Sequence, residues 1–184
     1  METTARLRTR DMAYIALFAV IMAVCAWITI PLPKPFVQFT LQTFGVFVAL
    51  NVLGGRRGLY VMLVYLLLGT VGVPVFSGML GGVGVLLNST GGYIIGFIAA
   101  ALVYWLVTAR LGEEPWVRAA GCVLGLAVCY AFGTAWFLVV YARDKGPVGL
   151  MTALMWCVIP YIVPDLLKLA LAMAVSARVK KFLK

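Results

Sequence analysis

The residues best suited to chemistry in this chain are two opposite charges, Asp165 and Lys168, in an apolar stretch at residues 146–177 that holds no other charge. Their spacing of three residues puts both side chains on one face of a helix. A charge at the centre of a membrane helix costs roughly 2.5–3.5 kcal/mol on insertion scales, so such residues usually face a protein interior and mark a substrate or ion site. The alternative is an ion pair that neutralises itself and only fixes helix packing. We expect the pair to belong to a binding site.

The composition indicates that the helix carrying this pair, and the rest of the chain, lies in a membrane. Among 184 residues, 64% are hydrophobic, 11% are charged and none is histidine, which is unlike an ordinary soluble domain. We predict one integral-membrane domain over residues 1–184, without a nucleotide-binding domain beside it. Any energy source must then be an ion gradient or another subunit. The apolar run after Arg10 has no clear signal-peptide cleavage site, so we expect it to be retained as the first helix.

The charges and the proline and glycine clusters divide the sequence into six apolar spans. Each span is compared with the roughly 20 apolar residues that cross a bilayer. The prolines at 31, 33 and 35 break the chain after the first span, because proline removes hydrogen-bond donors and restricts the preceding residue. We therefore predict an all-α membrane protein with six transmembrane helices, at residues 12–30, 38–53, 59–71, 91–109, 119–141 and 148–175.

The segment between the third and fourth predicted helices, residues 72–90, is rich in glycine and fits a loop better than a helix. Irregular backbone at membrane depth is tolerated where it is buried in protein or lines a cavity. We predict a re-entrant or capping loop on the outer side that bounds, with the break at residues 31–37, a pocket opening outward. Gly84 permits close approach to a ligand, and Asn88 offers a donor and an acceptor. A loop that merely turns back is the alternative.

Two prolines, Pro160 and Pro164, interrupt the last predicted helix just before the charged pair. A kinked or broken helix frees backbone carbonyls, and discontinuous helices often build substrate sites in transporters. A proline kink without function is the alternative. Its coincidence with Asp165 and Lys168 favours a functional site.

The basic residues predict the orientation of the chain, since cytoplasmic loops carry the positive excess. Of the 15 lysines and arginines, 11 fall on one side of the six-helix layout, three (Lys34, Arg143 and Lys145) fall on the other, and Lys168 lies within the membrane. We therefore expect both termini in the cytoplasm. Nucleic acid is not expected as a partner, because the sequence lacks a dense basic stripe interleaved with exposed aromatic residues.

Enzyme chemistry has few suitable residues here. The chain has no histidine for a nucleophile–histidine mechanism, and Asp165 is the one carboxylate expected within the membrane. The cysteines stand singly in apolar spans without a Cys-x-x-Cys motif, so we interpret them as buried hydrophobic residues and not as metal ligands or disulfides. We predict neither catalysis nor a bound metal or cofactor. The four cysteines are Cys25, Cys122, Cys129 and Cys157.

Five segments, in order along nearly the whole chain, form a pattern that no single glycine-rich string would carry alone. They are FTLQTFGV at 39–46, GGRRG at 54–58, GVPVF at 72–76, TGGYIIGF at 90–97 and PDLLK at 164–168. With its hydropathy, this pattern resembles the biotin-specific substrate-binding (S) component of bacterial energy-coupling-factor (ECF) transporters. The resemblance implies a six-helix S component in the bacterial cytoplasmic membrane. It would capture biotin outside and work with a transmembrane coupling protein and two cytoplasmic ATPases.

The resemblance also implies binding residues that suit biotin. Asp165 can accept from a ureido N–H, Lys168 can donate to the ureido oxygen, and Asn88 can do either. A carboxylate is an equally plausible partner for Lys168, so the orientation of biotin stays open. The other expected substrate-binding residues are the aromatic Phe36, Phe39, Phe76 and Tyr93 against the bicycle, Thr40 and Gln42 near the pocket floor, and Gly84.

Assembly with a coupling protein requires close helix approach. Ala19 and Ala23, four residues apart, give the first predicted helix small residues at the spacing typical of such contacts. We expect them to contact the coupling protein, with internal packing as the alternative.

Three other functions stay open: an S component for a different small vitamin, an ion-coupled secondary transporter with Asp165 as its protonated site, and a non-transporting membrane scaffold.

Overall fold

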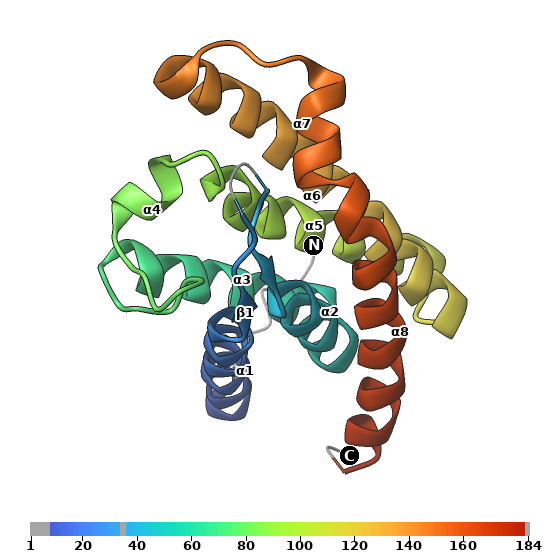
Figure 1. The fold of residues 1–184 in the computed structure, drawn as a ribbon. Helices are drawn as coiled ribbons and strands as arrows, with labels where there is room; N and C mark the ends of the chain where they lie inside the picture. The colour runs from blue at the N-terminus through green and yellow to red at the C-terminus, as the bar shows by residue number, and fades with distance from the viewer. Residues whose placement is uncertain (1–7, 34–35, 183–184) are drawn as a thin grey trace.

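The computed structural model describes residues 8–33 and 36–182, which form an almost entirely helical bundle (Figure 1). Within this part of the chain, four segments are long and apolar enough to cross a membrane. The prediction of an all-helical membrane protein is therefore confirmed. The four segments are α1 (Thr9–Trp27), α5 (Gly91–Leu111), α6 (Pro115–Lys145) and the joined helices α7 (Leu150–Cys157) and α8 (Ile159–Phe182). Two shorter helices, α2 (Gln42–Leu53) and α3 (Gly55–Thr70), follow α1.

A two-stranded hairpin joins α1 to α2. The strands β1 (Thr29–Ile30) and β2 (Phe39–Thr40) pair antiparallel, with Thr29 opposite Thr40. The predicted helices at 12–30 and 38–53 therefore extend too far toward each other. Proline-rich backbone cannot form a helix there, and the hairpin satisfies the N–H and C=O groups on either side. Lys34 and Pro35, between the strands, lie outside the described residues.

The turn between α2 and α3 is made by one residue, Gly54, with a φ of +82° that favours glycine. Helix α3 then begins at Gly55, so the arginines predicted to lie in the turn are part of its first turn. The following segment, residues 72–90, is irregular as predicted except for the short helix α4 (Val83–Leu87). Trp27 Nε1 donates to Pro74 O across 2.8 Å, which ties this segment to the end of α1.

Helices α5 and α6 form a closely packed hairpin. A Cβ on Gly125 of α6 would lie 2.8 Å from Ala100 O of α5, so a side chain there would force the helices apart. Helix α6 extends beyond the predicted residues 119–141 at both ends. Pro115 occupies its first position, where no N–H is needed, and Gly146, with a φ of +99°, ends it. Hydropathy alone had ended the predicted helix before Arg143 and Lys145.

The last predicted helix is broken in two, as its prolines indicated. The break falls at Val158, with φ −127° and ψ −59°, and separates α7 from α8. Pro160 is the second residue of α8 and Pro164 lies inside it. Figure 1 shows α7 and α8 joined end to end on the right of the molecule, and α8 packs alongside α2.

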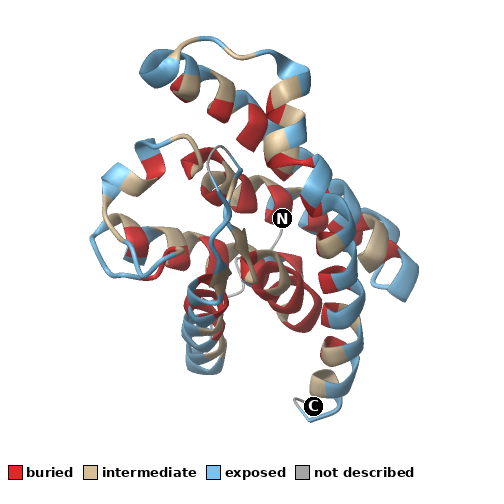
Figure 2. Ribbon diagram, in the orientation of Figure 1, coloured by how far each residue is buried: buried red, intermediate tan, exposed pale blue. Residues whose placement is uncertain are grey.

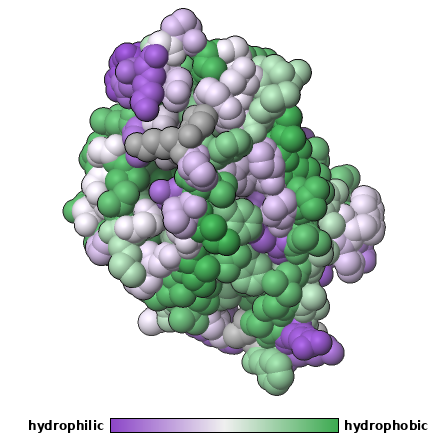
Figure 3. Space-filling model, in the orientation of Figure 1, coloured by the Kyte–Doolittle hydropathy of each residue, from purple (hydrophilic) through white to green (hydrophobic). Residues whose placement is uncertain are grey.

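Buried residues follow the inward faces of the helices (Figure 2). Many large apolar side chains are exposed on the outside. Leu17, Val139 and Leu167, for example, are more than half exposed. Figure 3 shows an apolar surface with strongly hydrophilic residues gathered toward opposite edges of the face in view. Such a surface suits lipid contact. The chain is a multi-pass membrane protein.

The small residues of α1 do not form an open surface. Ala19 and Ala23 are 2% and 4% exposed and belong to the core where α1 packs against α2 and α3. The prediction that these two residues contact a coupling protein is therefore corrected in favour of internal packing. The exposed face of α1 instead carries Ala16, Val20 and Val24. Helical periodicity identifies a row of small residues on one face of α1, but it does not show which helix packs against that face.

Candidate ligand-binding site

A cavity of about 640 Å³ opens between the β1–β2 hairpin, the segment before α5, and helices α2, α5, α6, α7 and α8. This volume lies in the range of small-molecule sites. Both segments predicted to bound a pocket line it, residues 31–37 through Phe36 and Val37, and residues 72–90 through Ser77 and Asn88 among others. Asp165 and Lys168 also line it.

The charged pair is buried at this cavity. Lys168 Nζ lies 2.7 Å from Asp165 Oδ1, and the two residues are 7% and 3% exposed. Burying either charge alone would be costly, whereas a paired and hydrogen-bonded arrangement compensates much of the desolvation. The spacing of three residues on α8 brings the carboxylate and the ammonium together, as the sequence predicted.

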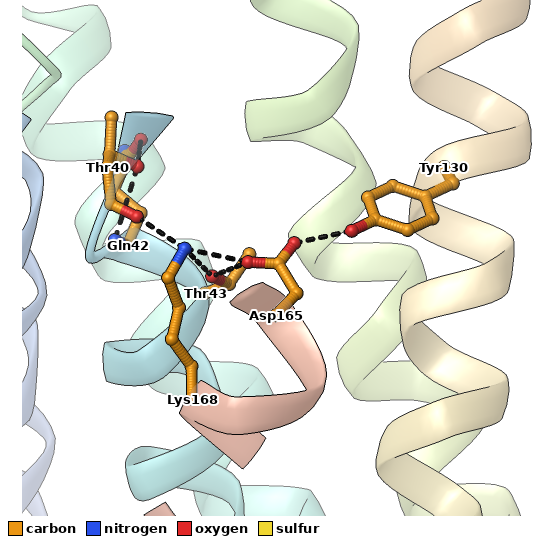
Figure 4. A network of polar contacts seen from close by, with 6 residues as sticks. All are labelled: Thr40, Gln42, Thr43, Tyr130, Asp165 and Lys168. Carbon is orange, nitrogen blue, oxygen red and sulfur yellow. Dashed lines mark hydrogen bonds and ion pairs between the residues drawn. The ribbon is translucent and has the colours of Figure 1, made fainter. Parts of the chain in front are cut away.

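Strand β2 and two further helices, α2 and α6, complete the hydrogen bonding of this pair (Figure 4). Lys168 Nζ donates to Thr40 O at 2.7 Å and to Thr43 Oγ1 at 3.2 Å, besides Asp165. Thr43 Oγ1 donates to Asp165 Oδ1 at 2.8 Å, and Tyr130 of α6 donates to Asp165 Oδ2 at 2.5 Å. All three ammonium N–H groups therefore have protein acceptors, while Oδ2 keeps room for one more donor.

Thr40 and Gln42, which the resemblance implies near the pocket floor, line the cavity beside this network. Thr40 Oγ1 donates to Gln42 Oε1 at 3.2 Å, and Gln42 Nε2 donates to Tyr65 OH at 2.7 Å. Tyr65 in turn donates to Val75 O at 2.9 Å. Gln42 thus links the start of α2 to α3 and to the segment after α3, which fixes the floor from two sides.

Asn88 and Tyr93 also line the cavity. Asn88 Oδ1 accepts from Thr90 N and Thr90 Oγ1, both at 2.9 Å, so the side-chain oxygen is used locally. Its Nδ2 group has no hydrogen bond to any other residue in the described part of the chain and is free to donate into the cavity. Tyr93 OH lies 3.0 Å from Thr134 Oγ1 on α6.

The position of Tyr93 depends on Gly133. A Cβ on Gly133 would lie 2.2 Å from the Tyr93 ring, so any other residue would displace the ring. Cys129, one turn earlier on α6, donates through Sγ to Tyr93 O at 3.5 Å. All four cysteines are buried and unbonded to each other, as predicted, and Cys129 and Cys157 lie at the cavity wall.

Three predicted binding residues lie outside the cavity lining. Phe39 lies against the ammonium group instead, with its ring centroid 4.0 Å from Lys168 Nζ in a cation–π contact. Phe76 is fully buried against Tyr65, with ring centroids 5.6 Å apart. Gly84 lies on α4, where no protein atom comes within 4 Å of an added Cβ. Phe36 does line the cavity, at the hairpin.

The sequence interpretation missed two hydrogen-bonding residues of the network, Thr43 and Tyr130, and a third at the wall, Tyr161. Tyr161 OH donates to Val37 O and holds the hairpin against α8. A signal for Tyr130 was present in α6, where aromatic residues that line the cavity recur at helical spacing. These residues are Tyr130, Phe137 and Tyr141.

Comparison with known proteins identifies the family of this chain. A family model described as the BioY family matches residues 1–184. The chain belongs to the BioY family. Among its relatives, the "Biotin transporter BioY" of Thermotoga maritima is 38% identical, over 94% of this chain and 96% of the relative. The "Probable biotin transporter BioY" of Pyrococcus horikoshii is 36% identical, over 95% of this chain and 98% of the relative.

Two solved structures share the fold of this BioY-family chain. The crystal structure of the S-component for biotin from an ECF-type ABC transporter matches with a TM-score of 0.83 and 22% identity, over 97% of this chain and 95% of the other. The S component of a bacterial ECF transporter matches with a TM-score of 0.55 and 15% identity, over 95% and 98%. The fold is therefore that of an S component.

Proposed function

We propose that this chain is a biotin-binding S component of an ECF-type transporter and not an enzyme. The observation that carries the proposal is the buried Asp165–Lys168 pair at the cavity, whose carboxylate has one acceptor position left on Oδ2. The membership in the BioY family supports it independently. The cavity has a volume of about 640 Å³, which accommodates a vitamin-sized ligand.

The free hydrogen-bonding groups suit the ureido ring of biotin. Asp165 Oδ2 accepts one ureido N–H, and Asn88 Nδ2 donates to the ureido oxygen. Lys168 reaches the same oxygen if it exchanges its longest hydrogen bond, the one of 3.2 Å to Thr43. Tyr93 and Phe36, which line the cavity, are placed to pack against the apolar bicycle.

The proposed layout in the membrane has six spans, with α2 and α3 as the two short ones. The 16 residues of α3 extend for about 24 Å, somewhat less than the hydrocarbon core of about 30 Å. Both termini lie in the cytoplasm of a bacterial cell, and the cavity opens outward, as the basic residues favour. Arg6, Lys34 and Lys184, which contribute to that count, lie outside the described residues.

The proposed partners are a transmembrane coupling protein and two cytoplasmic ATPases, which supply the energy. Transport should therefore require ATP in the reconstituted complex and persist when an ionophore removes the proton gradient. The opposite dependence would favour a secondary transporter. A proton on Asp165 would have to break a 2.7 Å ion pair with Lys168, which argues against that alternative.

The central experiment is calorimetric titration of the purified protein with biotin. Saturable binding with one site per chain supports the proposal. Titration with riboflavin and thiamine tests the alternative of another vitamin. Absence of binding to biotin, riboflavin and thiamine would favour a scaffold.

The membrane layout is tested by single-cysteine labelling after replacement of the four native cysteines. A cysteine at Arg143 should react from outside intact cells, and one at Arg110 only after the membrane is opened.

A further inference from the structure

The last turns of α6 line the same cavity as the charged pair, about three helical turns beyond Tyr130, which meets Asp165. Helix α6 has 31 residues and is about 46 Å long, more than the roughly 30 Å hydrocarbon core of a membrane. One end must therefore project beyond the lipid. Tyr141, Asp144 and Lys145, in its last turns, line the cavity. Lys145 is exposed, so its ammonium group can contact a ligand while it stays in water.

The four charges lining the cavity are two of each sign, but they do not all pair with one another. Among the described residues, they are Asp144, Lys145, Asp165 and Lys168. Asp165 and Lys168 neutralise each other, and Asp144 pairs with Arg143, outside the lining, at 3.0 Å. Lys145 forms none of the ion pairs in the described part of the chain, and its Nζ lies 6.0 Å from the Tyr141 ring centroid. One positive charge is left over, which suits a ligand with one negative charge.

We infer that Lys145 binds the carboxylate of the ligand and makes the site selective for the free acid over its neutral esters and amides. This inference rests on the proposed function, since it assigns the second end of biotin. It also fixes the orientation of biotin, with the ureido ring at Asp165 and the acyl tail pointing to the end of α6.

The spacing along α6 supports this orientation. Tyr130, whose hydroxyl meets Asp165, and Tyr141, beside the Lys145 ammonium group, are eleven residues apart. They are therefore separated by about 16 Å along the helix axis. Biotin carries its ureido ring and its carboxylate at opposite ends of an elongated molecule. One extended ligand, with a hydrogen bond at each end, can bridge two groups separated in this way.

The opposite orientation, with the carboxylate at Lys168, fits the structure less well. Any ligand oxygen at Lys168, from a ureido group or a carboxylate, requires the lysine to exchange one of its three protein acceptors. A ligand carboxylate there would also lie beside Asp165, whose own negative charge is 2.7 Å from the same ammonium group. Two carboxylates sharing one buried lysine would repel each other. At Lys145 the ligand carboxylate meets an unpaired cation at an exposed position.

The test compares biotin with biotin methyl ester, whose tail is neutral, on the purified full chain. In Lys145→Met the affinity for biotin should fall roughly two- to fivefold, the range expected of an exposed ion pair. The affinity for the methyl ester should stay unchanged. Lys145→Arg should retain the preference for biotin, and Lys181→Met, which removes the same charge from an exposed position on α8, should have no effect. The preference of the wild type should also shrink as salt is raised.

Each outcome decides the inference. Equal losses for biotin and its methyl ester in Lys145→Met would mean that the lysine does not bind the carboxylate. Unchanged binding of both would have the same meaning, while leaving biotin binding by the wild type intact as support for the proposed function. If the wild type binds neither compound, the proposed function itself fails, and with it the orientation inferred from it.

Discussion

Tyr130 donates a hydrogen bond of 2.5 Å to Asp165 Oδ2, from the middle of α6 to the broken helix pair α7 and α8. Thr43 and Lys168 both hold the other carboxylate oxygen, Oδ1. The carboxylate is therefore held from three helices, α2, α6 and α8, and turns its remaining acceptor position toward the cavity. The tyrosine is a positioning residue for the group that we propose meets the ureido ring.

Tyr130→Phe should weaken biotin binding about tenfold. The change removes a hydrogen bond to a charged group, which is worth roughly 1.5–3 kcal/mol, and lets the Asp165 carboxylate rotate. Calorimetric titration of the purified variant measures the loss. Tyr60→Phe, which removes a hydroxyl outside the cavity, is the matched control and should bind like the parent. Unchanged affinity in Tyr130→Phe would mean that Thr43 and Lys168 alone orient the carboxylate.

Asp165→Asn and Lys168→Met should each reduce biotin binding severely. Each leaves the other charge buried and unpaired, at a cost of about 3–5 kcal/mol in comparable cases, and each removes a proposed ligand contact. The double variant restores the charge balance, so its thermal stability in detergent should recover more than either single variant. Its biotin binding should not recover. A double variant that folds and binds biotin like the parent would show that the pair is only structural.

The positions of the long helices and the pairing of Asp165 with Lys168 could be predicted because they depend on local sequence. Apolar length defines a span, and a spacing of three residues on one helix defines a contact. The break before Asp165 was predictable for the same reason, because proline acts on its own helix. The β1–β2 hairpin was not, since Thr29 and Ile30 continue an apolar run that reads as helix.

Contacts between distant helices could not be read from the sequence. Thr43 and Tyr130 lie 122 and 35 residues from Asp165. Helical spacing can mark Tyr130 as part of one face of α6, but it does not show which distant residue that face meets. Phe76 shows the converse limit. The resemblance implies an aromatic contact of Phe76 with the ligand, but Phe76 is fully buried, with its ring against Tyr65 and Gly69. Whether a residue is buried depends on which other segment packs against it, and the hydrophobic periodicity of the sequence does not identify that segment.

Gly69→Ala should destabilise the chain, whereas Gly84→Ala should not. A Cβ on Gly69 would lie 2.0 Å from the Phe76 ring, and overpacking of this kind typically costs about 1–3 kcal/mol. Gly84 has nothing within 4 Å of an added Cβ. The midpoint of thermal unfolding in detergent should therefore fall only for Gly69→Ala. Biotin titration of Gly84→Ala separately tests the sequence prediction that this glycine approaches the ligand, and unchanged affinity is expected.

The final prediction concerns α1, where sequence and structure assign the same alanines to different surfaces. Ala23 is 4% exposed in the core, so Ala23→Leu should lower the thermal stability of the isolated chain by overpacking. Ala16→Leu adds the same bulk on the exposed face of α1 and should leave stability and biotin affinity unchanged. Uptake by the reconstituted complex completes the comparison, because Ala16→Leu impairs it only if this face meets a partner. If Ala23→Leu keeps normal stability and biotin affinity but loses uptake, Ala23 does not belong to the core. Ala19 and Ala23 would then form a coupling surface, as the sequence predicted.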